Sequence, residues 1–107
     1  MFKRYQKPQP HETSITGSWV HENGAVKADD VCERIEYLKS SYLRRVGVSK
    51  EFGDWMVLYQ DPEDMRYWAL TYPQSEMHGG GPPALMNISK EEANSKYQIT
   101  GEASSPW

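Results

Sequence analysis

The sequence reads Met77-His78-Gly79-Gly80-Gly81-Pro82-Pro83-Ala84-Leu85 at the point where we expect the fold to turn its sharpest corner. Glycine adopts positive φ and carries no side chain, whereas proline fixes φ and lacks an N–H donor. The residue before a proline is also pushed into extended geometry. We therefore predict a free turn through Gly79 and Gly80, followed by a stiff, extended exit. This corner would join an aromatic-rich hairpin to an apolar segment at 84–88 and a short helix.

The same stretch is compatible with two kinds of chemistry. His78-Gly79-Gly80-Gly81 is similar to the oxyanion loop of lipases and esterases, in which backbone N–H groups face a developing negative charge. That chemistry requires a Gly-x-Ser-x-Gly elbow, and the nearest candidate, residues 47–51, lacks the closing glycine. A phosphate-binding loop would require Gly-Lys-Ser/Thr or Gly-x-Gly-x-x-Gly, and the sequence has neither. We therefore favour a structural corner, and keep a small enzyme using the His78–Gly81 loop as the alternative.

Two β-rich runs before the corner, residues 54–60 and 66–72, predict a hairpin. Apolar side chains fall on both faces of these runs, so we expect the hairpin to lie centrally in a sheet or to have one face covered by a helix. The connecting residues 61–65 place proline at an early turn position. Three carboxylates crowd this turn, but the Asp-x-Asp-x-Asp-Gly pattern of a calcium loop is missing. We therefore predict no metal site there, and keep the acidic turn as a candidate protein-binding patch.

Residues 29–46 carry the strongest helical pattern in the chain. Asp30 and Glu33 have capping-box spacing, and acidic residues open the segment while basic residues close it, as the helix dipole favours. Gly47 suits a C-terminal stop. The apolar positions recur at helical spacing along one stripe, at Val31, Ile35, Leu38, Tyr42 and Leu43. Beside this stripe, Cys32 is expected to be a small packed side chain rather than a nucleophile.

Two weaker elements complete the pattern. Residues 14–22 have β-rich alternation and predict a strand, which Asn23-Gly24 would end in a turn. After the corner, Ser89 and Glu92 form a capping box that opens a short helix near residues 90–97.

Together these elements predict an α+β fold. An antiparallel sheet of about four strands would pack on the one long helix 29–46, with the short helix near the C-terminus. A length of 107 residues favours a single domain, which we place at residues 14–99. Residues 1–13 contain prolines and no periodic pattern, so we expect a mobile N-terminal arm. Residues 100–107 are expected to form a flexible C-terminal tail.

The predicted domain is acidic once its N-terminal arm is set aside. The whole chain has 12 basic and 15 acidic residues, a net charge of −3. Residues 1–12 contain three basic residues and one acidic residue, so the remainder has 9 basic and 14 acidic residues and a net charge of −5. Such a charge is unsuited to nucleic acid, which proteins hold through phosphate contacts. It suits a basic protein partner, because opposite charge accelerates encounter.

The composition of the chain also indicates the cellular compartment in which the protein acts. One cysteine, Cys32, excludes an internal disulfide and fits a reducing cytosol. No apolar run approaches the ~18–20 residues of a membrane span, and the N-terminus lacks the apolar segment of a secretory signal. We therefore expect a cytoplasmic protein without a membrane partner. The sequence offers no metal-ligand spacing, no complete catalytic set and no cofactor motif.

Three patterns follow one another in a distinctive order. The first is Trp55-x-x-Leu58-x-x-Asp61-Pro62-x-Asp64-x-x-Tyr67-Trp68. The second is Tyr72-Pro73-x-Ser75-Glu76-x-His78-Gly79-Gly80-Gly81-Pro82-Pro83-x-Leu85. The third is Ile88-Ser89, followed by Ala93 and Lys96-Tyr97. Together they resemble the immunity protein 27 family, and the resemblance covers residues 14–98.

The resemblance implies an antidote rather than an enzyme. Such families protect the producer of a bacterial polymorphic toxin, as in contact-dependent growth inhibition, from toxin that sibling cells deliver. The usual mechanism is 1:1 binding of the cognate toxin's C-terminal domain, which covers or obstructs the toxin's active site without a cofactor. Many of these toxins are nucleases with basic substrate clefts. We therefore expect a basic nuclease as partner, and an inhibitor that mimics phosphate charge.

Acidic side chains are the candidate toxin contacts, with an ordinary solvated carboxylate as the alternative for each. They lie in the predicted helix and in the acidic turn, at Glu33, Glu36, Asp61, Glu63 and Asp64. A generic protein-interaction domain is a further alternative, with aromatics such as Trp19 or Tyr59 exposed in a groove. Because the aromatics must supply much of the apolar core, we favour burial for these two.

Overall fold

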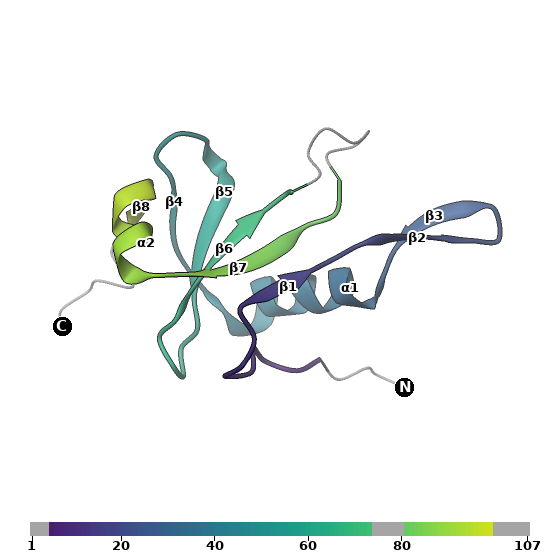
Figure 1. The fold of residues 1–107 in the computed structure, drawn as a ribbon, viewed down its shortest axis with the longest axis horizontal. Helices are drawn as coiled ribbons and strands as arrows, with labels where there is room; N and C mark the ends of the chain where they lie inside the picture. The colour runs from purple at the N-terminus through teal and green to yellow at the C-terminus, as the bar shows by residue number, and fades with distance from the viewer. Residues whose placement is uncertain (1–4, 74–80, 100–107) are drawn as a thin grey trace.

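The computed structural model describes residues 5–73 and 81–99. In this part of the chain, six strands form one antiparallel sheet and two further strands form a separate ribbon (Figure 1). The sheet has the order β1 (Ser14–Thr16), β7 (Ala84–Ile88), β6 (Tyr67–Thr71), β5 (Gly53–Gln60), β4 (Arg44–Ser49) and β8 (Tyr97–Ile99). The ribbon pairs β2 (Trp19–Glu22) with β3 (Ala25–Ala28). The helices are α1 (Asp30–Tyr37), which continues as the π-helix η1 (Leu38–Tyr42), and α2 (Lys90–Lys96).

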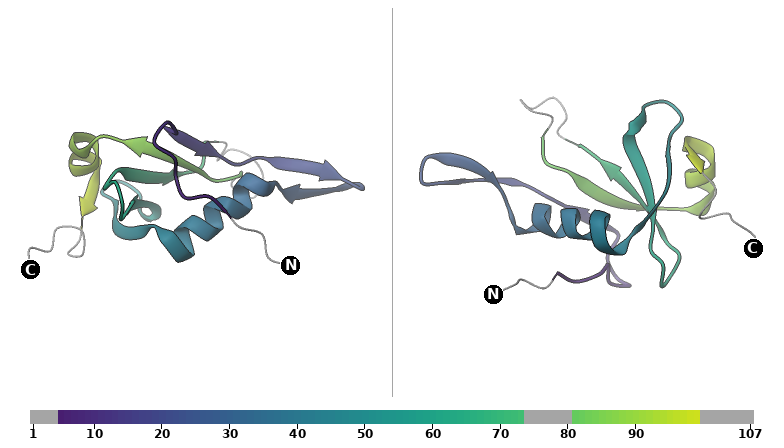
Figure 2. Two further views of the ribbon diagram at one scale, coloured as in Figure 1. Left: turned by 90° about the horizontal axis from the view of Figure 1, so that it is seen from below. Right: turned by 180° about the vertical axis from the view of Figure 1, so that it is seen from behind.

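The predicted hairpin is confirmed as the centre of the sheet. Strand β5 pairs with β6 in antiparallel register, with Tyr59 opposite Trp68, and β4 and β7 flank the pair. Its side chains alternate between the two faces. Val57 and Tyr59 belong to the core on the α1 side, whereas Leu58 packs with residues of α2. Figure 2 shows the two helices on different sides of the sheet.

The predicted fold class is wrong in two respects. In the described residues the sheet has six strands rather than about four, and it does not pack on one long helix. Segments α1 and η1 have 8 and 5 residues, so the helical segment spans 13 and ends at Tyr42, short of the predicted end of helix 29–46. The backbone is extended at Leu43, with φ −76° and ψ 150°, and continues as β4. The N-cap is Asp29, which accepts a hydrogen bond from the Cys32 N–H.

Pairing with the next strand, β5, and with the distant strand β8 overrides the helical pattern of residues 43–47. Gly47, predicted as a helix stop, lies inside β4 and pairs with both β5 and β8. A Cβ at this position would lie 2.5 Å from the carbonyl oxygen of Gln98, so glycine allows the two backbones to approach. The short C-terminal helix is confirmed as α2 with Ser89 as its N-cap, but Tyr97 already belongs to β8.

The single strand predicted at residues 14–22 divides into β1 and β2, which belong to different sheets. Gly17 lies at the division, where a Cβ would come within 2.5 Å of the Cys32 sulfur. Cys32 is buried there, which confirms its predicted role as a packed side chain. The predicted turn at Asn23 and Gly24 is also confirmed, because their φ angles of 53° and 78° are those of a type I′ turn.

Two apolar clusters stabilise the sheet. The larger lies between α1 and one face of the sheet, and it includes all five positions of the predicted apolar stripe, with Ile35 and Leu38 fully buried. The smaller lies around Val46, Leu58 and Ala93 on the α2 side. No helix in the described part of the chain has the length and apolarity to cross a membrane.

The glycine–proline corner is described only at its exit, because residues 74–80 lie outside the described part of the chain. Gly81 has a φ of 73°, a conformation that favours glycine, and Pro82 is buried before β7 begins. Residues 100–107 also lie outside the described part. The domain bounds, the mobile N-terminal arm and the flexible tail stay predictions.

Candidate functional site

Asp61, one of the predicted contacts, lies inside the β5–β6 turn. The residue is 1 % exposed. Its Oδ1 atom accepts hydrogen bonds from the Tyr42 hydroxyl at 2.8 Å and from the Glu63 N–H at 2.7 Å, which ties η1 to the turn. Burial, together with the neighbouring Asp61 carboxylate, raises the pKa of Tyr42, so this hydroxyl stays a donor. The position of Asp61 therefore gives it a role in holding the turn.

Glu63 and Asp64 are exposed beside Asp61 on the same turn. The Lys7 ammonium pairs with Glu63, and Arg66 pairs with Asp64 at 2.7 Å. The Lys7–Glu63 pair is exposed, and exposed pairs contribute little to stability, so a binding partner can replace this pair. The structure thus brings these three predicted carboxylates together on one turn.

Glu33 and Glu36 are exposed on α1, a different element from the turn. The Tyr5 hydroxyl donates to Glu33 at 2.6 Å, and Lys39 pairs with Glu36 at 3.1 Å. All four exposed candidates therefore have a partner in their own chain. Their role as toxin contacts stays a prediction.

Residues 5–12 run between α1 and the β5–β6 turn, held by two arginines. Arg34 donates to two backbone carbonyls of this segment at 2.9 and 3.1 Å and pairs with Glu12 at 2.8 Å. Arg66 donates to two further carbonyls at 2.7 and 2.9 Å. The Arg34–Glu12 side chains are only 17 % and 20 % exposed, and the guanidinium lowers the pKa of Glu12 to about 2.

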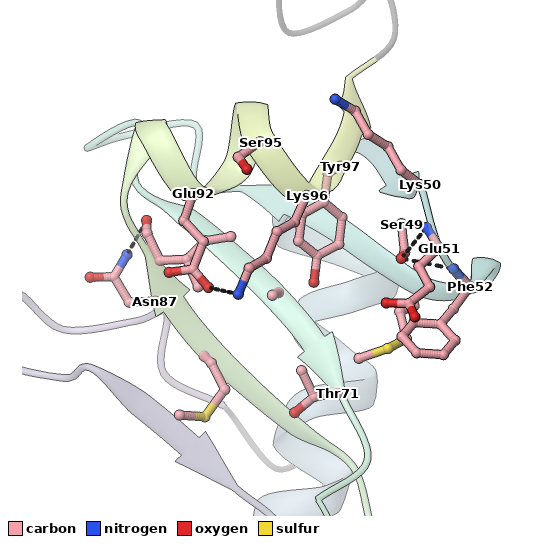
Figure 3. Close-up of a pocket in the computed structure, with 14 residues that line it drawn as sticks. Ser49, Lys50, Glu51, Phe52, Thr71, Asn87, Glu92, Ser95, Lys96 and Tyr97 are labelled. Atoms are coloured by element: carbon pink, nitrogen blue, oxygen red, sulfur yellow. Dashed lines mark hydrogen bonds and ion pairs between the residues drawn. The ribbon is translucent and has the colours of Figure 1, made fainter.

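The sheet face turned away from α1 carries a groove of about 740 Å³ (Figure 3). Side chains of β5, β6 and β7 form its floor, including Met56, Thr71 and Met86. Helix α2 forms one wall, where Lys96 pairs with Glu92 at 3.2 Å, and the β4–β5 turn forms the other. This groove was not predicted from the sequence, because its walls come from elements that only the sheet order brings together.

Aromatic side chains are exposed at the β4–β5 turn and at the start of β5, where hydrogen bonds hold the backbone of the turn. The Ser49 hydroxyl accepts hydrogen bonds from the N–H groups of Glu51 and Phe52, at 3.1 and 2.9 Å. Gly53 follows with a φ of 62°. Phe52 lines the groove and is 53 % exposed, whereas Trp55 is 65 % exposed.

Trp55 shares its strand face with Val57, as the alternation predicts, but it lies near the end of the sheet. Its ring centroid lies 6.1 Å from that of Tyr72. Tyr59, on the same face, is buried, which confirms that prediction, and Trp19 is half-buried. A signal for the exposed aromatics was present in the sequence, because Phe52 stands inside an otherwise polar turn.

Metal-ligating and nucleophilic side chains lie apart from one another or are buried in the described residues. Within residues 5–73 and 81–99, no three His, Cys, Asp or Glu side chains gather as a metal site requires. Burial raises the pKa of the Cys32 thiol, which disfavours the reactive thiolate. His78, on which the alternative enzyme depends, lies outside the described residues.

Comparison with known proteins identifies one family. A family model described as immunity protein 27 matches residues 21–89, well over half of the chain. No curated protein and no solved structure gives a match. The matched segment includes α1, the central hairpin and the β4–β5 turn.

Proposed function

The chain belongs to the immunity protein 27 family, and on that basis we propose that it binds and neutralises a cognate toxin domain. The observation that carries this proposal is the family match over residues 21–89. In the proposed mechanism, the chain covers or obstructs the toxin's active site in a 1:1 complex. Stoichiometric binding of this kind requires no catalytic step by the inhibitor.

We further propose that the toxin is a nuclease. A nuclease attracts phosphates with basic groups around its cleft, and the chain has a net charge of −3. Opposite charge would therefore accelerate the encounter and favour this class of partner over acidic proteins. The proposed setting is the cytoplasm of a cell that makes a polymorphic toxin, as in contact-dependent growth inhibition.

The exposed acidic residues support this proposal mainly through the rate of association. Glu33, Glu36, Glu63 and Asp64 can exchange their partners within the chain for basic groups of the toxin, and exposed charges act chiefly on the association rate. Asp61 contributes indirectly, because it holds the turn that carries two of them.

Titration calorimetry of the chain against the C-terminal domain encoded by the gene immediately upstream tests the proposal. We expect 1:1 binding with a Kd in the nanomolar range, roughly −12 kcal/mol. Coexpression should also restore growth to cells that make the toxin domain, and the chain should suppress cleavage of DNA or RNA by that domain. No binding at micromolar concentrations, together with no protection, would refute the antidote function. Binding and protection without nuclease activity in the toxin would refute only the nuclease assignment.

A further inference from the structure

The segment Glu51–Trp55 presents apolar surface that its own protein leaves largely uncovered. Trp55 is the most exposed large apolar side chain in the described residues, and Phe52 is also more than half exposed. Tyr72 lies beside Trp55 on the α1 side of the sheet. Met86 lies with Phe52 along the groove on the opposite face, and the β4–β5 turn stands between the two. Cores of protein–protein interfaces are enriched in Trp, Tyr, Phe and Met. The segment therefore has the composition of an interface core.

The backbone of this segment is held in place before any partner binds. Besides the two hydrogen bonds to the serine hydroxyl described above, the Trp55 N–H donates to the Phe52 carbonyl at 3.3 Å. The preceding residue, Lys50, is anchored to α2. Its N–H donates to the Lys96 carbonyl at 3.0 Å, and its ammonium donates to the Asn94 carbonyl at 3.2 Å. A pre-ordered loop loses less entropy on binding, so its aromatic side chains can contribute more to affinity.

Two carboxylates alternate with these aromatics and indicate the charge of the occupant. Glu51 and Asp54 are exposed, and within the described part of the chain their carboxylates have no hydrogen bond or ion pair. A guanidinium satisfies both features of this surface, because it binds carboxylates through paired N–H donors and stacks on aromatic rings. The chain already contains such a contact, in which Arg66 lies 4.9 Å from the centroid of the Trp68 ring.

We propose that Glu51–Trp55, together with Tyr72, is the main docking surface for the toxin, and that its occupant is an arginine-bearing cationic segment of the toxin. The inference rests on the proposed antidote function and names the interface for it. Trp55 receives the guanidinium over its ring, and the two carboxylates pair with the cationic groups. Phe52 packs against apolar parts of the same segment at the mouth of the groove. The acidic residues of α1 and of the β5–β6 turn then steer the approach, while this segment anchors the complex.

Calorimetry with the same toxin domain, at low and at physiological salt, tests the assignment. The variants are Trp55→Ala, Phe52→Ala and the double variant Glu51→Gln/Asp54→Asn. Matched controls are Glu91→Gln, an exposed carboxylate of α2, and Val20→Ala, an exposed apolar residue of β2. All the substituted residues are exposed, so circular dichroism should show unchanged folds.

We expect Trp55→Ala to weaken binding by about 30-fold, as for an interface hot spot. The double variant should weaken it by about 10-fold at low salt and reduce its salt dependence. The two controls should bind within about 2-fold of wild type, as rim or remote positions do. If the wild type binds tightly and all three variants do the same, the docking surface is wrong while the antidote function stands. A loss with Trp55→Ala but none with the double variant overturns the cationic occupant. No binding by the wild type overturns both proposals.

Discussion

Asp61→Ala removes the acceptor that organises the β5–β6 turn, and we expect a large loss of stability. The wild-type carboxylate accepts hydrogen bonds from the Tyr42 hydroxyl at 2.8 Å and from the N–H groups of Glu63 and Asp64 at 2.7 and 3.3 Å. A buried group left without its partner costs about 1–3 kcal/mol. Counting the hydroxyl and one N–H at about 1.5 kcal/mol each, in the lower half of that range, the free energy of unfolding should fall by about 3 kcal/mol. For a domain of this size, the Tm should fall by about 12–24 °C.

Urea unfolding followed by tryptophan fluorescence would measure this loss. Asp61→Asn serves as the isosteric control, because its amide oxygen can still accept two of the bonds, and it should lose only about 1 kcal/mol. Glu63→Ala removes an exposed carboxylate from the same turn and should change stability by about 0.5 kcal/mol or less. If Asp61→Ala proved no more destabilising than Glu63→Ala, the buried carboxylate would not hold the turn.

Three further substitutions test other parts of the structure. The pKa of Glu12 is lowered from 4.5 to about 2, so its contribution to stability is present above pH 4.5 and is lost as pH falls towards 2. Glu12→Gln should therefore cost on the order of 2 kcal/mol at pH 7 and about 0.5 kcal/mol or less at pH 2, and urea titrations giving equal losses at both pH values would contradict this. Gly47→Ala forces a Cβ against the Gln98 carbonyl, and should cost about 2 kcal/mol and speed amide hydrogen exchange in β8. Unchanged exchange there would argue against the close approach. Leu38→Ala, at a fully buried position, should lower the free energy of unfolding by about 3 kcal/mol. A loss below about 1 kcal/mol in thermal unfolding would mean that η1 collapses onto the space left behind.

Local patterns predicted those parts of the fold that local contacts stabilise. The capping of α2 by Ser89, the turn at Asn23 and Gly24 and the β5–β6 hairpin each depend on residues close together in the chain. The end of α1 does not, because basic residues such as Arg44 suit a helix C-terminus as well as a strand. Pairing of β4 with β5 and β8 decides between these two structures, and that pairing is invisible to a local pattern.

The candidate site was harder to predict, because exposure depends on where neighbouring elements end. In the sequence, Asp61 resembles any other turn carboxylate, yet Tyr42 of η1 reaches it from 19 residues away. Trp55 follows the alternation of a core-facing strand, but it lies near the start of β5 and is 65 % exposed. Both outcomes depend on how elements far apart in the chain are arranged in space, which a local pattern does not contain.

In the β4–β5 turn and the start of β5, the residues that stabilise the backbone conformation differ from the residues whose side chains are exposed. The shape depends on the Ser49 hydroxyl, on the positive φ of Gly53 and on backbone bonds to α2. The side chains at positions 51, 52, 54 and 55 are exposed, so their exchange leaves the core intact. When the binding surface of the toxin changes, an antidote of this kind can restore complementarity through a few substitutions in one short segment. Because the substituted side chains are exposed, its folding stability should change little. Among diverging toxin–antidote pairs, we therefore expect variation to concentrate at positions 51, 52 and 54, while Trp55, which belongs to the family pattern, persists together with the serine and the glycine.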